Sequence, residues 1–210
     1  MGIDSAWRIG VRDTAVWHME VIMCGRYDFT VEQSEEIMDI LKKVSEKFQG
    51  TEAKTGEIFP TNLAPILILE EQEVQPSLSN WGFPKYDGKG VIINARAETA
   101  FEKKTFRDSL VNRRCIVPST GFYEWDSEKT KHMFHLADTN ALYMAGLYSN
   151  YGGESRYVIL TTAANESIKN IHTRMPLIIP KKDIKDWIMD QSATGDFLNG
   201  VPPQLIREAV

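Results

Sequence analysis

Four short segments place reactive or charged side chains inside runs that are otherwise apolar or turn-forming. They are CGRY from Cys24, NARAETA from Asn94, RRCIVPSTGFYEW ending at Trp125, and IHTRMP between Ile171 and Pro176. Each segment carries one group that can take part in a reaction: a thiol, an amide, a carboxylate or an imidazole. A nucleophile assisted by an acid/base group and an orienting group is a recurrent catalytic arrangement. No single segment is specific, so the four matter only if the fold brings them together.

For three of these side chains, the neighbouring residues indicate a chemical role. Glu124 lies between Tyr123 and Trp125, and burial among aromatic rings raises the pKa of a carboxylic acid, which suits general acid/base work. An ion-paired glutamate at a strand end is the alternative, and the pattern leaves it open. His172 falls near the end of a predicted helix, where the helix dipole favours the imidazolium. Asn94 follows an apolar run, where a buried amide needs hydrogen-bond partners and can orient another group.

Other kinds of chemistry are disfavoured. The sequence lacks the signatures of phosphate-binding loops and paired-cysteine metal sites, so we expect no cofactor and no metal. His132 and His135 are three residues apart in a predicted strand, so they point to opposite faces and cannot easily share one ion. Cys115 has apolar neighbours, which predicts a buried, unreactive thiol. A disulfide between Cys24 and Cys115 stays open.

Composition and charge limit the classes of protein to which the chain can belong. The chain has 210 residues, of which 42% are hydrophobic and 25% charged, which is typical of one globular domain rather than a disordered chain. No run approaches the ~20 apolar residues of a membrane span, so no membrane partner is expected. Two cysteines fit a reducing cytoplasm. The net charge of −5 gives no sign of general nucleic-acid binding.

The distribution of positive charge is more informative than its sum. The run KKTFRDSLVNRR between Lys103 and Arg114 holds five cations and one aspartate. Arg26, Arg96 and Arg174 stand singly inside apolar or glycine-containing stretches. For each of these three arginines, a structural ion pair and a contact with an anionic ligand are both open interpretations.

The elements that must position these residues are short. Apolar residues at helical spacing predict a helix within Val31–Phe48, with Thr30 as its cap. Shorter helices are predicted at 105–111, 165–171 and 182–189. Strands are predicted at 24–29, 64–69, 74–81, 91–93, 114–117, 121–125, 132–136, 143–148, 157–162 and 177–179. Many short strands with a few helices predict a single β-rich α+β domain of mostly antiparallel strands.

The first 23 residues lack the features of a secretory signal, because charges interrupt any apolar core and no small-residue cleavage site follows. Met23 stands directly before Cys24 and can serve as a start position. A leader that is removed later and a retained N-terminal arm are the alternatives. We expect the domain to comprise residues 24–210, with residues 1–23 absent or removed in the active form.

Taken together, the four segments, in this order and spacing, resemble the SOS response-associated peptidase (SRAP) family over residues 24–180. These are proteins that crosslink to abasic sites in single-stranded DNA, and their fold has a barrel-like β core with a few flanking helices. The resemblance implies four catalytic residues, namely Cys24, Asn94, Glu124 and His172. It implies that DNA phosphates are bound by Arg26, Arg96 and Arg174 and that a base stacks on Trp81, the aromatic residue of the tryptophan–glycine motif.

The resemblance also implies a reaction and a partner. N-terminal Cys24 would form a thiazolidine with the aldehyde of an abasic site in single-stranded DNA, a lyase-like reaction that shields the lesion during DNA repair. The protein is expected to be a monomer in the cytoplasm, associated with the nucleoid if it is bacterial, without cofactor or metal. A thiazolidine needs a free amine and a thiol on the same residue, so we expect peptide-bonded Cys24 to be inactive. The 23-residue extension is therefore the largest departure from the family.

Two other functions stay open. A cysteine peptidase would use Cys24 as nucleophile and His172 as base, and could remove residues 1–23 by self-processing. A non-catalytic single-strand binder would use Trp81 and the arginines alone. A covalent adduct with abasic DNA separates the first proposal from both.

Overall fold

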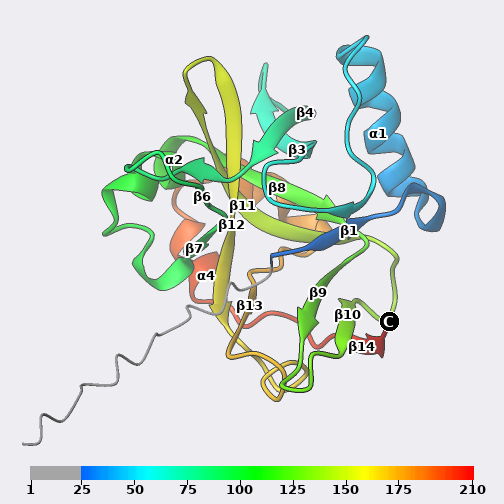
Figure 1. Ribbon diagram of the computed structural model, residues 1–210. Coiled ribbons are helices and arrows are strands. Elements are labelled where there is room, and N and C mark those ends of the chain that lie inside the picture. The colour runs from blue at the N-terminus through cyan, green and yellow to red at the C-terminus, as the bar shows by residue number, and fades with distance from the viewer. Residues whose placement is uncertain (1–24) are drawn as a thin grey trace, which may run out of the picture.

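The computed structural model describes residues 25–210 (Figure 1). Residues 1–24 lie outside the described part of the chain, so the predictions made for Cys24 and for the N-terminal extension stay predictions. The strands are β1 (Tyr27–Phe29), β2 (Gly56–Ile58), β3 (Leu63–Glu70), β4 (Glu73–Trp81), β5 (Phe83–Pro84), β6 (Val91–Ile92), β7 (Asn94–Arg96), β8 (Arg114–Ser119), β9 (Gly121–Trp125), β10 (Lys131–His135), β11 (Leu142–Tyr151), β12 (Glu154–Ala163), β13 (Arg174–Pro176) and β14 (Ile206–Ala209). The helices are α1 (Glu35–Lys47), α2 (Lys104–Asn112), α3 (Ile184–Met189) and α4 (Thr194–Leu198), with short 3-10 helices η1 (Val31–Gln33), η2 (Ala97–Thr99) and η3 (Lys181–Asp183).

Five strands close into a barrel. β3 runs antiparallel to β4, β4 lies parallel to β12, and β12, β11 and β8 follow as antiparallel neighbours. The ring closes where β8 meets β3, at the pair Leu67 and Ile116. Closure leaves these strands without a free edge and packs their inward side chains into one core. β7 and β13 pair with the C-terminal half of β12, one on each of its edges.

A second sheet lies beside the barrel and has the order β14-β10-β9-β1-β2. Only Thr120 separates β8 of the barrel from β9 of this sheet, so one stretch of chain links the two. Figure 1 shows β9, β10 and β14 together below the barrel, with the C-terminus beside β14. β1 is an inner strand, because it pairs antiparallel with both β2 and β9.

Helix α1 forms because its sequence has a cap and one apolar face. The Oγ of Ser34 accepts a hydrogen bond from the backbone N–H of Ile37 at 3.4 Å, which satisfies one free donor of the first turn. Ile37, Ile40 and Val44 are buried on one side, as the period of 3.6 requires. The predicted cap, Thr30, is wrong, since it precedes η1 and makes no capping bond.

Aromatic rings join the barrel to the second sheet. Trp81 in β4 packs edge-on against Tyr27 in β1, with ring centroids 5.3 Å apart, and stacks on Tyr157 in β12 at 6.3 Å. The two tyrosine hydroxyls hydrogen-bond to each other at 2.6 Å. Burial raises the pKa of both phenols, so both stay protonated near neutral pH. This cluster fixes β1 against β12.

The C-terminal ends of α2 and α3 share one buried cation, Arg114. Its donors reach four backbone carbonyls: Nε that of Trp187 at 2.6 Å, Nη1 those of Leu110 at 2.9 Å and Val111 at 3.1 Å, and Nη2 that of Ile188 at 3.2 Å. Carbonyls at helix C-termini lack partners within the helix and carry partial negative charge. A guanidinium satisfies several of them at once, so this member of the cationic run is structural.

The predicted fold class is confirmed: the described chain is β-rich α+β, mostly antiparallel, with a barrel core. The strands predicted between 114 and 162 correspond to β8 through β12. The helix predicted at 165–171 is wrong, because that segment forms hydrogen-bonded turns. The strand predicted at 177–179 is reduced to one bridge between Ile178 and Met144. No helix within residues 25–210 has both the length and the apolar character to cross a membrane.

Candidate functional site

The paired ends of β1 and β9 hold Glu124. The backbone N–H of Tyr123 donates to the carbonyl of Arg26 at 3.0 Å, so Gly25 and Glu124 come next along the two segments. Glu124 is only 3% exposed. Alternation along β9 places its side chain on the same face as buried Phe122. Glu124 is therefore a buried carboxylate at a strand end, and its acid/base role stays a prediction.

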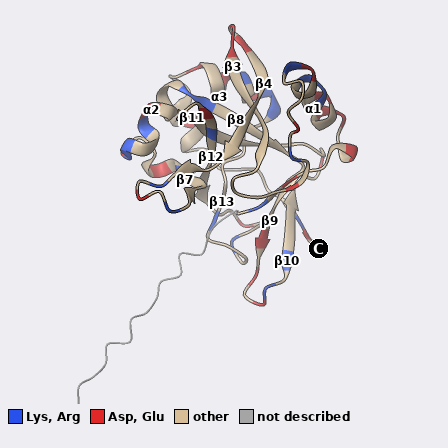
Figure 2. Cartoon of the chain, turned by 45° about the horizontal axis from the view of Figure 1, so that its top comes forward, with Lys and Arg blue, Asp and Glu red and all other residues tan. Residues whose placement is uncertain are grey.

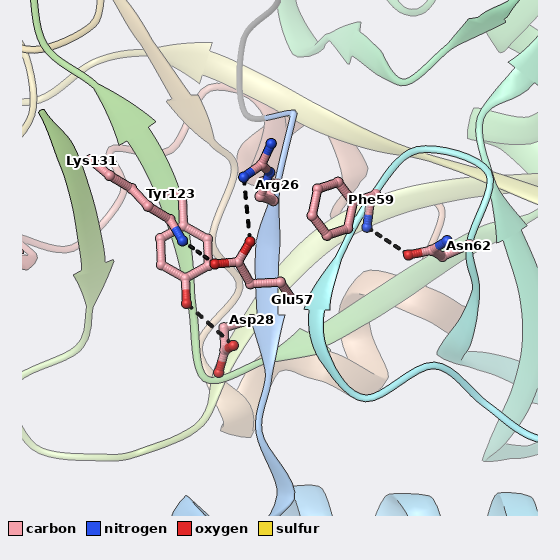
Figure 3. Close-up of polar contacts among 7 residues, drawn as sticks. All are labelled: Arg26, Asp28, Glu57, Phe59, Asn62, Tyr123 and Lys131. Carbon is pink, nitrogen blue, oxygen red and sulfur yellow. Dashed lines mark hydrogen bonds and ion pairs between the residues drawn. The ribbon is translucent and has the colours of Figure 1, made fainter. Parts of the chain in front are cut away.

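The opposite face of the second sheet presents Arg26 between two aromatic rings. The guanidinium of Arg26 lies 4.3 Å from the ring centroid of Phe59 and 4.9 Å from that of Trp125. The backbone N–H of Phe59 donates to Oδ1 of Asn62 at 2.9 Å, which fixes the turn that presents the ring (Figure 3). Phe59 is 38% exposed. This face therefore offers solvent a cation and an aromatic surface side by side.

Glu57 on β2 connects this arginine to a lysine (Figure 3). Its carboxylate pairs with Arg26 Nη1 at 3.4 Å and with Lys131 on β10. The Lys131 ammonium also lies 3.8 Å from the ring centroid of Tyr123. The Tyr123 hydroxyl donates to Oδ1 of Asp28 at 3.3 Å, and burial together with this nearby carboxylate raises the pKa of Tyr123. Two cations and two acids are thus interleaved on one face of the second sheet.

Four of the remaining predicted residues, Asn94, Arg96, His172 and Arg174, lie beside the second half of β12. Along one edge of β12, β7 continues the position of β4, and Thr161 lies opposite Arg96. Along the other edge, β13 continues the position of β11, and Ala163 lies opposite Arg174. The NARAETA and IHTRMP segments are therefore held on either side of one strand.

A bidentate ion pair ties these two segments together. Arg174 Nη1 and Nη2 contact Glu98 Oε1 and Oε2 at 2.5 and 2.7 Å, and Nη2 also donates to the carbonyl of Thr161 at 2.6 Å. The hydrogen bond from Arg174 holds the pKa of Glu98 below its usual value. Of the three arginines predicted to bind phosphates, Arg26 and Arg174 are ion-paired. Arg96 is exposed and takes part in no ion pair among the described residues.

His172 lies in the turn that leads into β13. Its Nδ1 accepts a hydrogen bond from the backbone N–H of Arg174 at 3.0 Å. A nitrogen that accepts carries no proton, so the ring is neutral in this geometry, with its proton on Nε2. The helix expected before His172 is wrong, because hydrogen-bonded turns precede the residue, so no helix dipole acts on its ring.

Trp81 does not lie where a base could reach it. Its side chain is fully buried between Tyr27 and Tyr157, and its indole Nε1 donates to the carbonyl of Ile93 at 3.0 Å. The predicted base-stacking role of Trp81 therefore does not fit its position in the core. Gly82 follows with φ 114°, and a Cβ there would lie 2.7 Å from Val91, so the motif fits only glycine.

The structure thus assembles the site in two halves. Asn94, Arg96, His172 and Arg174 lie beside the second half of β12. Arg26 directly precedes β1, and Glu124 lies near the end of β9, where these two segments pair. The Tyr27–Tyr157 hydrogen bond connects the two halves. Trp81 supports the first half, because the Ile93 carbonyl that it contacts immediately precedes Asn94.

The cysteine and the two histidines that the sequence analysis set aside form no metal or disulfide site among the described residues. Cys115 is fully buried, and burial raises the pKa of its thiol well above the ordinary value, so it is unreactive as predicted. His132 contacts Asp126 and His135 contacts Glu208, so the two histidines use separate partners. In the part of the chain that the structure describes, no three His, Cys, Asp or Glu residues are placed to hold a metal ion.

In the cationic run between Lys103 and Arg114, some of the side chains already have partners within the protein. Figure 2 shows Lys and Arg gathered on the outer side of α2. Arg107 Nε donates to the carbonyl of Phe101 at 2.7 Å, Arg113 pairs with Asp108, and Arg114 is buried. Lys103 and Lys104 are exposed. Most of this run therefore stabilises the ends of α2.

Sequence reasoning missed the residues around Arg26. Glu57 and Phe59 lie some thirty positions along the chain from Arg26, and only the pairing of β1 with β2 brings them to it. Trp125 and Tyr123 stood beside Glu124 in the sequence. Their alternation with Phe122 and Glu124 could have indicated that they face the other way.

Comparisons with known proteins agree with this arrangement. Residues 23–205 match the family model described as SOS response associated peptidase (SRAP). Abasic site processing protein YoqW of Bacillus subtilis is 40% identical over 119 residues, covering 52% of this chain and 53% of that protein. Abasic site processing protein YedK of Escherichia coli is 30% identical over 183 residues, covering 80% and 81%. The chain thus spans about half the length of the B. subtilis relative and most of the E. coli one.

Solved structures share the fold. A crystal structure of a protein from Bacteroides thetaiotaomicron superposes with a TM-score of 0.73 at 25% identity, covering 89% of this chain and 92% of that chain. One from Bordetella bronchiseptica gives 0.71 at 24%, covering 89% and 99%. The barrel, the second sheet and the four sequence motifs together define a β-rich protein whose predicted site residues lie at the paired ends of β1 and β9 and beside the second half of β12. The chain belongs to the SRAP family.

Proposed function

We propose that this protein processes abasic sites in single-stranded DNA by forming a covalent adduct between Cys24 and the aldehyde of the opened sugar. Curated relatives in the same family are named abasic site processing proteins, which supports the substrate class. The observation that carries the proposal is the arrangement at the first described residues after Cys24. A cation flanked by aromatic rings, Arg26, follows two residues later, and buried Glu124 lies at the paired strand end.

The adduct uses both nucleophiles of an N-terminal cysteine. The α-amine adds to the aldehyde and loses water to give an imine, and the thiol then adds across the C=N bond to close a thiazolidine ring. An α-amino group has a pKa near ~8, against ~10.4 for lysine, so roughly a tenth of it is free base at neutral pH. Ring closure is intramolecular and gains from a high effective concentration. The active form therefore begins at Cys24.

The other site residues supply proton transfer and orientation. Glu124 moves protons during imine formation and ring closure. Asn94 orients the amine or the carbonyl of Cys24. His172, whose Nδ1 is held by the backbone N–H of Arg174, offers its Nε2–H to the ring oxygen of the sugar or to the adjacent phosphate. These groups come from three places in the fold: Glu124 from β9, Asn94 from β7, and His172 from the turn before β13.

Single-stranded DNA is bound through cations and exposed rings. Arg96 is ready to contact a phosphate, whereas Arg26 and Arg174 exchange their carboxylate partners for phosphates on binding. Phe59 and Trp125 take the base-contacting role that buried Trp81 cannot fill. Stacking and phosphate contacts without base readout suit a protein that must accept any sequence around a lesion.

Denaturing gel electrophoresis tests the reaction. Protein that begins at Cys24, the 1–210 form and Cys24→Ala are each mixed with single-stranded DNA that carries one abasic site. A heat-stable shifted band is expected only for the first. A band of equal intensity with Cys24→Ala or with the 1–210 form overturns the role of the free aminothiol, while binding without any band indicates a non-catalytic binder.

The salt dependence of affinity tests the phosphate contacts. Three contacts, one for each arginine, give a slope of log K against log salt near −2, at ~0.7 per contact. A slope near zero, measured by fluorescence anisotropy with undamaged single-stranded DNA, would exclude this binding mode.

A second candidate function is peptidase activity, which the family description names. In that reaction Cys24 attacks a carbonyl with His172 as base. Intact-mass measurement after expression tests self-processing. Loss of residues 1–23 that requires both Cys24 and Glu124 supports it, and cleavage of unrelated peptides supports a general peptidase.

A further inference from the structure

The hairpin of β9 and β10 holds a buried histidine directly across from Glu124. His132 and Glu124 are paired residues in the antiparallel register of these strands, so their side chains leave the same face of the sheet. Side chains at such positions have Cβ atoms about 4.5–5.5 Å apart. His132 is 7% exposed and Glu124 is 3% exposed. An imidazole and a carboxylate therefore share one buried neighbourhood.

Asp126 fixes the orientation of this histidine. Asp126 Oδ2 lies 2.9 Å from His132 Nε2, and its Oδ1 accepts the backbone N–H groups of Glu128 and Thr130, both at 2.9 Å. The hydrogen bond with His132 is the main reason that the pKa of Asp126 lies below its usual value. An ionised carboxylate only accepts hydrogen bonds, so Nε2 of His132 carries a proton.

The other ring nitrogen has no role in holding the hairpin together. Nδ1 of His132 is buried and has no hydrogen-bond partner among the described residues. A buried polar atom without a partner costs free energy that an apolar side chain at this position would avoid. Because Nε2 already carries a proton, Nδ1 is the nitrogen that can accept or release one. An unsatisfied nitrogen of this kind next to a functional carboxylate needs an explanation.

The charged groups that face His132 are few. Glu124 and Asp126 face it from β9 and the following turn. On the other side, β14 places Ala209 opposite His132, and Arg207, opposite Phe134, is the diagonal neighbour on the same face. Arg207 is exposed, so solvent screens its charge. Among the described residues that the strand register places on this face, Glu124 and Asp126 are the two acids beside the ring.

We propose that His132, held by Asp126, is a positioning residue that sets the proton balance of Glu124 during adduct formation. Uptake of a proton at Nδ1 places a positive charge beside Glu124 and favours its carboxylate form. Release of that proton leaves a neutral ring and lets Glu124 hold a proton more readily. His132 does not touch the sugar or the DNA in this proposal. The inference rests on the proposed reaction of Cys24 and names the group that regulates its acid/base residue.

The test compares His132→Gln with His135→Gln in protein that begins at Cys24. Glutamine keeps an N–H for Asp126 but has no nitrogen that can titrate, so the hairpin contact survives and the proton site is lost. His135 lies on the same strand and contacts Glu208 at 3.3 Å on its exposed side, which makes it a matched control. Rates of adduct formation on abasic single-stranded DNA are measured from pH 5 to 9, beside affinity for undamaged DNA and thermal unfolding.

We expect His132→Gln to slow adduct formation about tenfold near neutral pH, which is less than the 10²–10⁴-fold contribution of a direct acid/base group, because His132 acts only through Glu124. Its rate profile should lose one ionisation step, while DNA affinity stays unchanged and His135→Gln behaves like the parent. Asp126→Asn, which weakens the hold on Nε2, should move the same step along the pH axis without removing it.

The experiment distinguishes failure of the proposed function from failure of the proposed role of His132. A parent protein that forms no adduct overturns the proposed function itself, and the role of His132 with it. A reactive parent whose rate profile is unchanged in His132→Gln overturns only the role of His132. If His132→Gln is poorly folded, an unshifted profile in Asp126→Asn overturns the role of His132 in its place.

Discussion

Glu98 and Arg174 form a bidentate ion pair between two sequence motifs that lie 76 positions apart, with oxygen–nitrogen distances of 2.5 and 2.7 Å. The pair spans the end of β12 and joins η2 to the start of β13. The side chain of Arg174 is 14% exposed and that of Glu98 is 45% exposed. The carboxylate is therefore the more accessible partner, and an incoming anion can replace it without uncovering the arginine.

Glu98→Gln should lower the free energy of unfolding modestly, by about 0.5–1 kcal/mol at pH 7, because the pair is partly exposed and screened. Arg174 lowers the pKa of Glu98, so the stabilisation is full above the ordinary carboxyl pKa of 4.5 and is lost as the pH falls through the lower folded value. Urea unfolding of both proteins at pH 7 and pH 3.5 measures this. A difference that does not shrink at the lower pH contradicts the assignment.

Glu57→Gln should tighten the binding of undamaged single-stranded DNA. The change removes the carboxylate that neutralises Arg26 and Lys131, so a phosphate no longer has to displace it. The slope of log K against log salt should become steeper by up to ~0.7. Glu52→Gln removes an exposed acid from the loop before β2 and serves as control. Equal affinities for both variants would show that the effect is only one of net charge.

Tyr27→Phe should lower the free energy of unfolding by about 1–3 kcal/mol, because it leaves the buried hydroxyl of Tyr157 without its partner. The double variant with Tyr157→Phe should lose less than the sum of the two single variants. Burial raises the pKa of both phenols, so the coupling should not change between pH 6 and 9. Denaturant unfolding of all four proteins gives the coupling energy, and strict additivity would contradict the hydrogen bond.

Arg114→Lys should destabilise the fold by about 2–4 kcal/mol. An ammonium has no planar fork and cannot reach the carbonyls of two helix ends at once, so buried acceptors on α2 and α3 lose their donor. Lys103→Gln, at an exposed position before α2, is the control and should lie within about 0.5 kcal/mol of the parent. Thermal or urea unfolding measures the stability of both variants. A loss of unfolding free energy below about 1 kcal/mol for Arg114→Lys argues against a stabilising role of Arg114 at the two helix ends.

The fold class followed from the sequence because its strands are strongly patterned. The runs that became β8 through β12 are apolar or alternating and bounded by turn residues, so local pattern and burial agree. The short helix expected at 165–171 failed because Asn165 instead donates to the carbonyls of Pro202 and Pro203 and accepts from Ser167. Its side chain anchors a turn, and the sequence pattern cannot distinguish that from a helix cap.

The site was predictable only as a set of motifs. Nothing local indicates that Trp81 is enclosed by two tyrosines from distant strands, and an aromatic residue before glycine fits a surface position as well as a core position. Likewise, the partners of Arg26 and Arg174 come from β2 and η2. Such pairings depend on strand register, which long-range packing decides.

The two ends of β12 differ sharply in their surroundings. Its last residues carry β7 and β13, whereas its first residue follows the turn at Gly152 and Gly153, where an added Cβ would meet no atom within 4 Å. At ~3.3 Å per residue, ten residues separate these ends by roughly 30 Å. The β11–β12 hairpin projects away from β13 in Figure 1. This turn is therefore a suitable attachment point for a fluorophore or an affinity tag, because it lies far from the residues proposed to bind DNA.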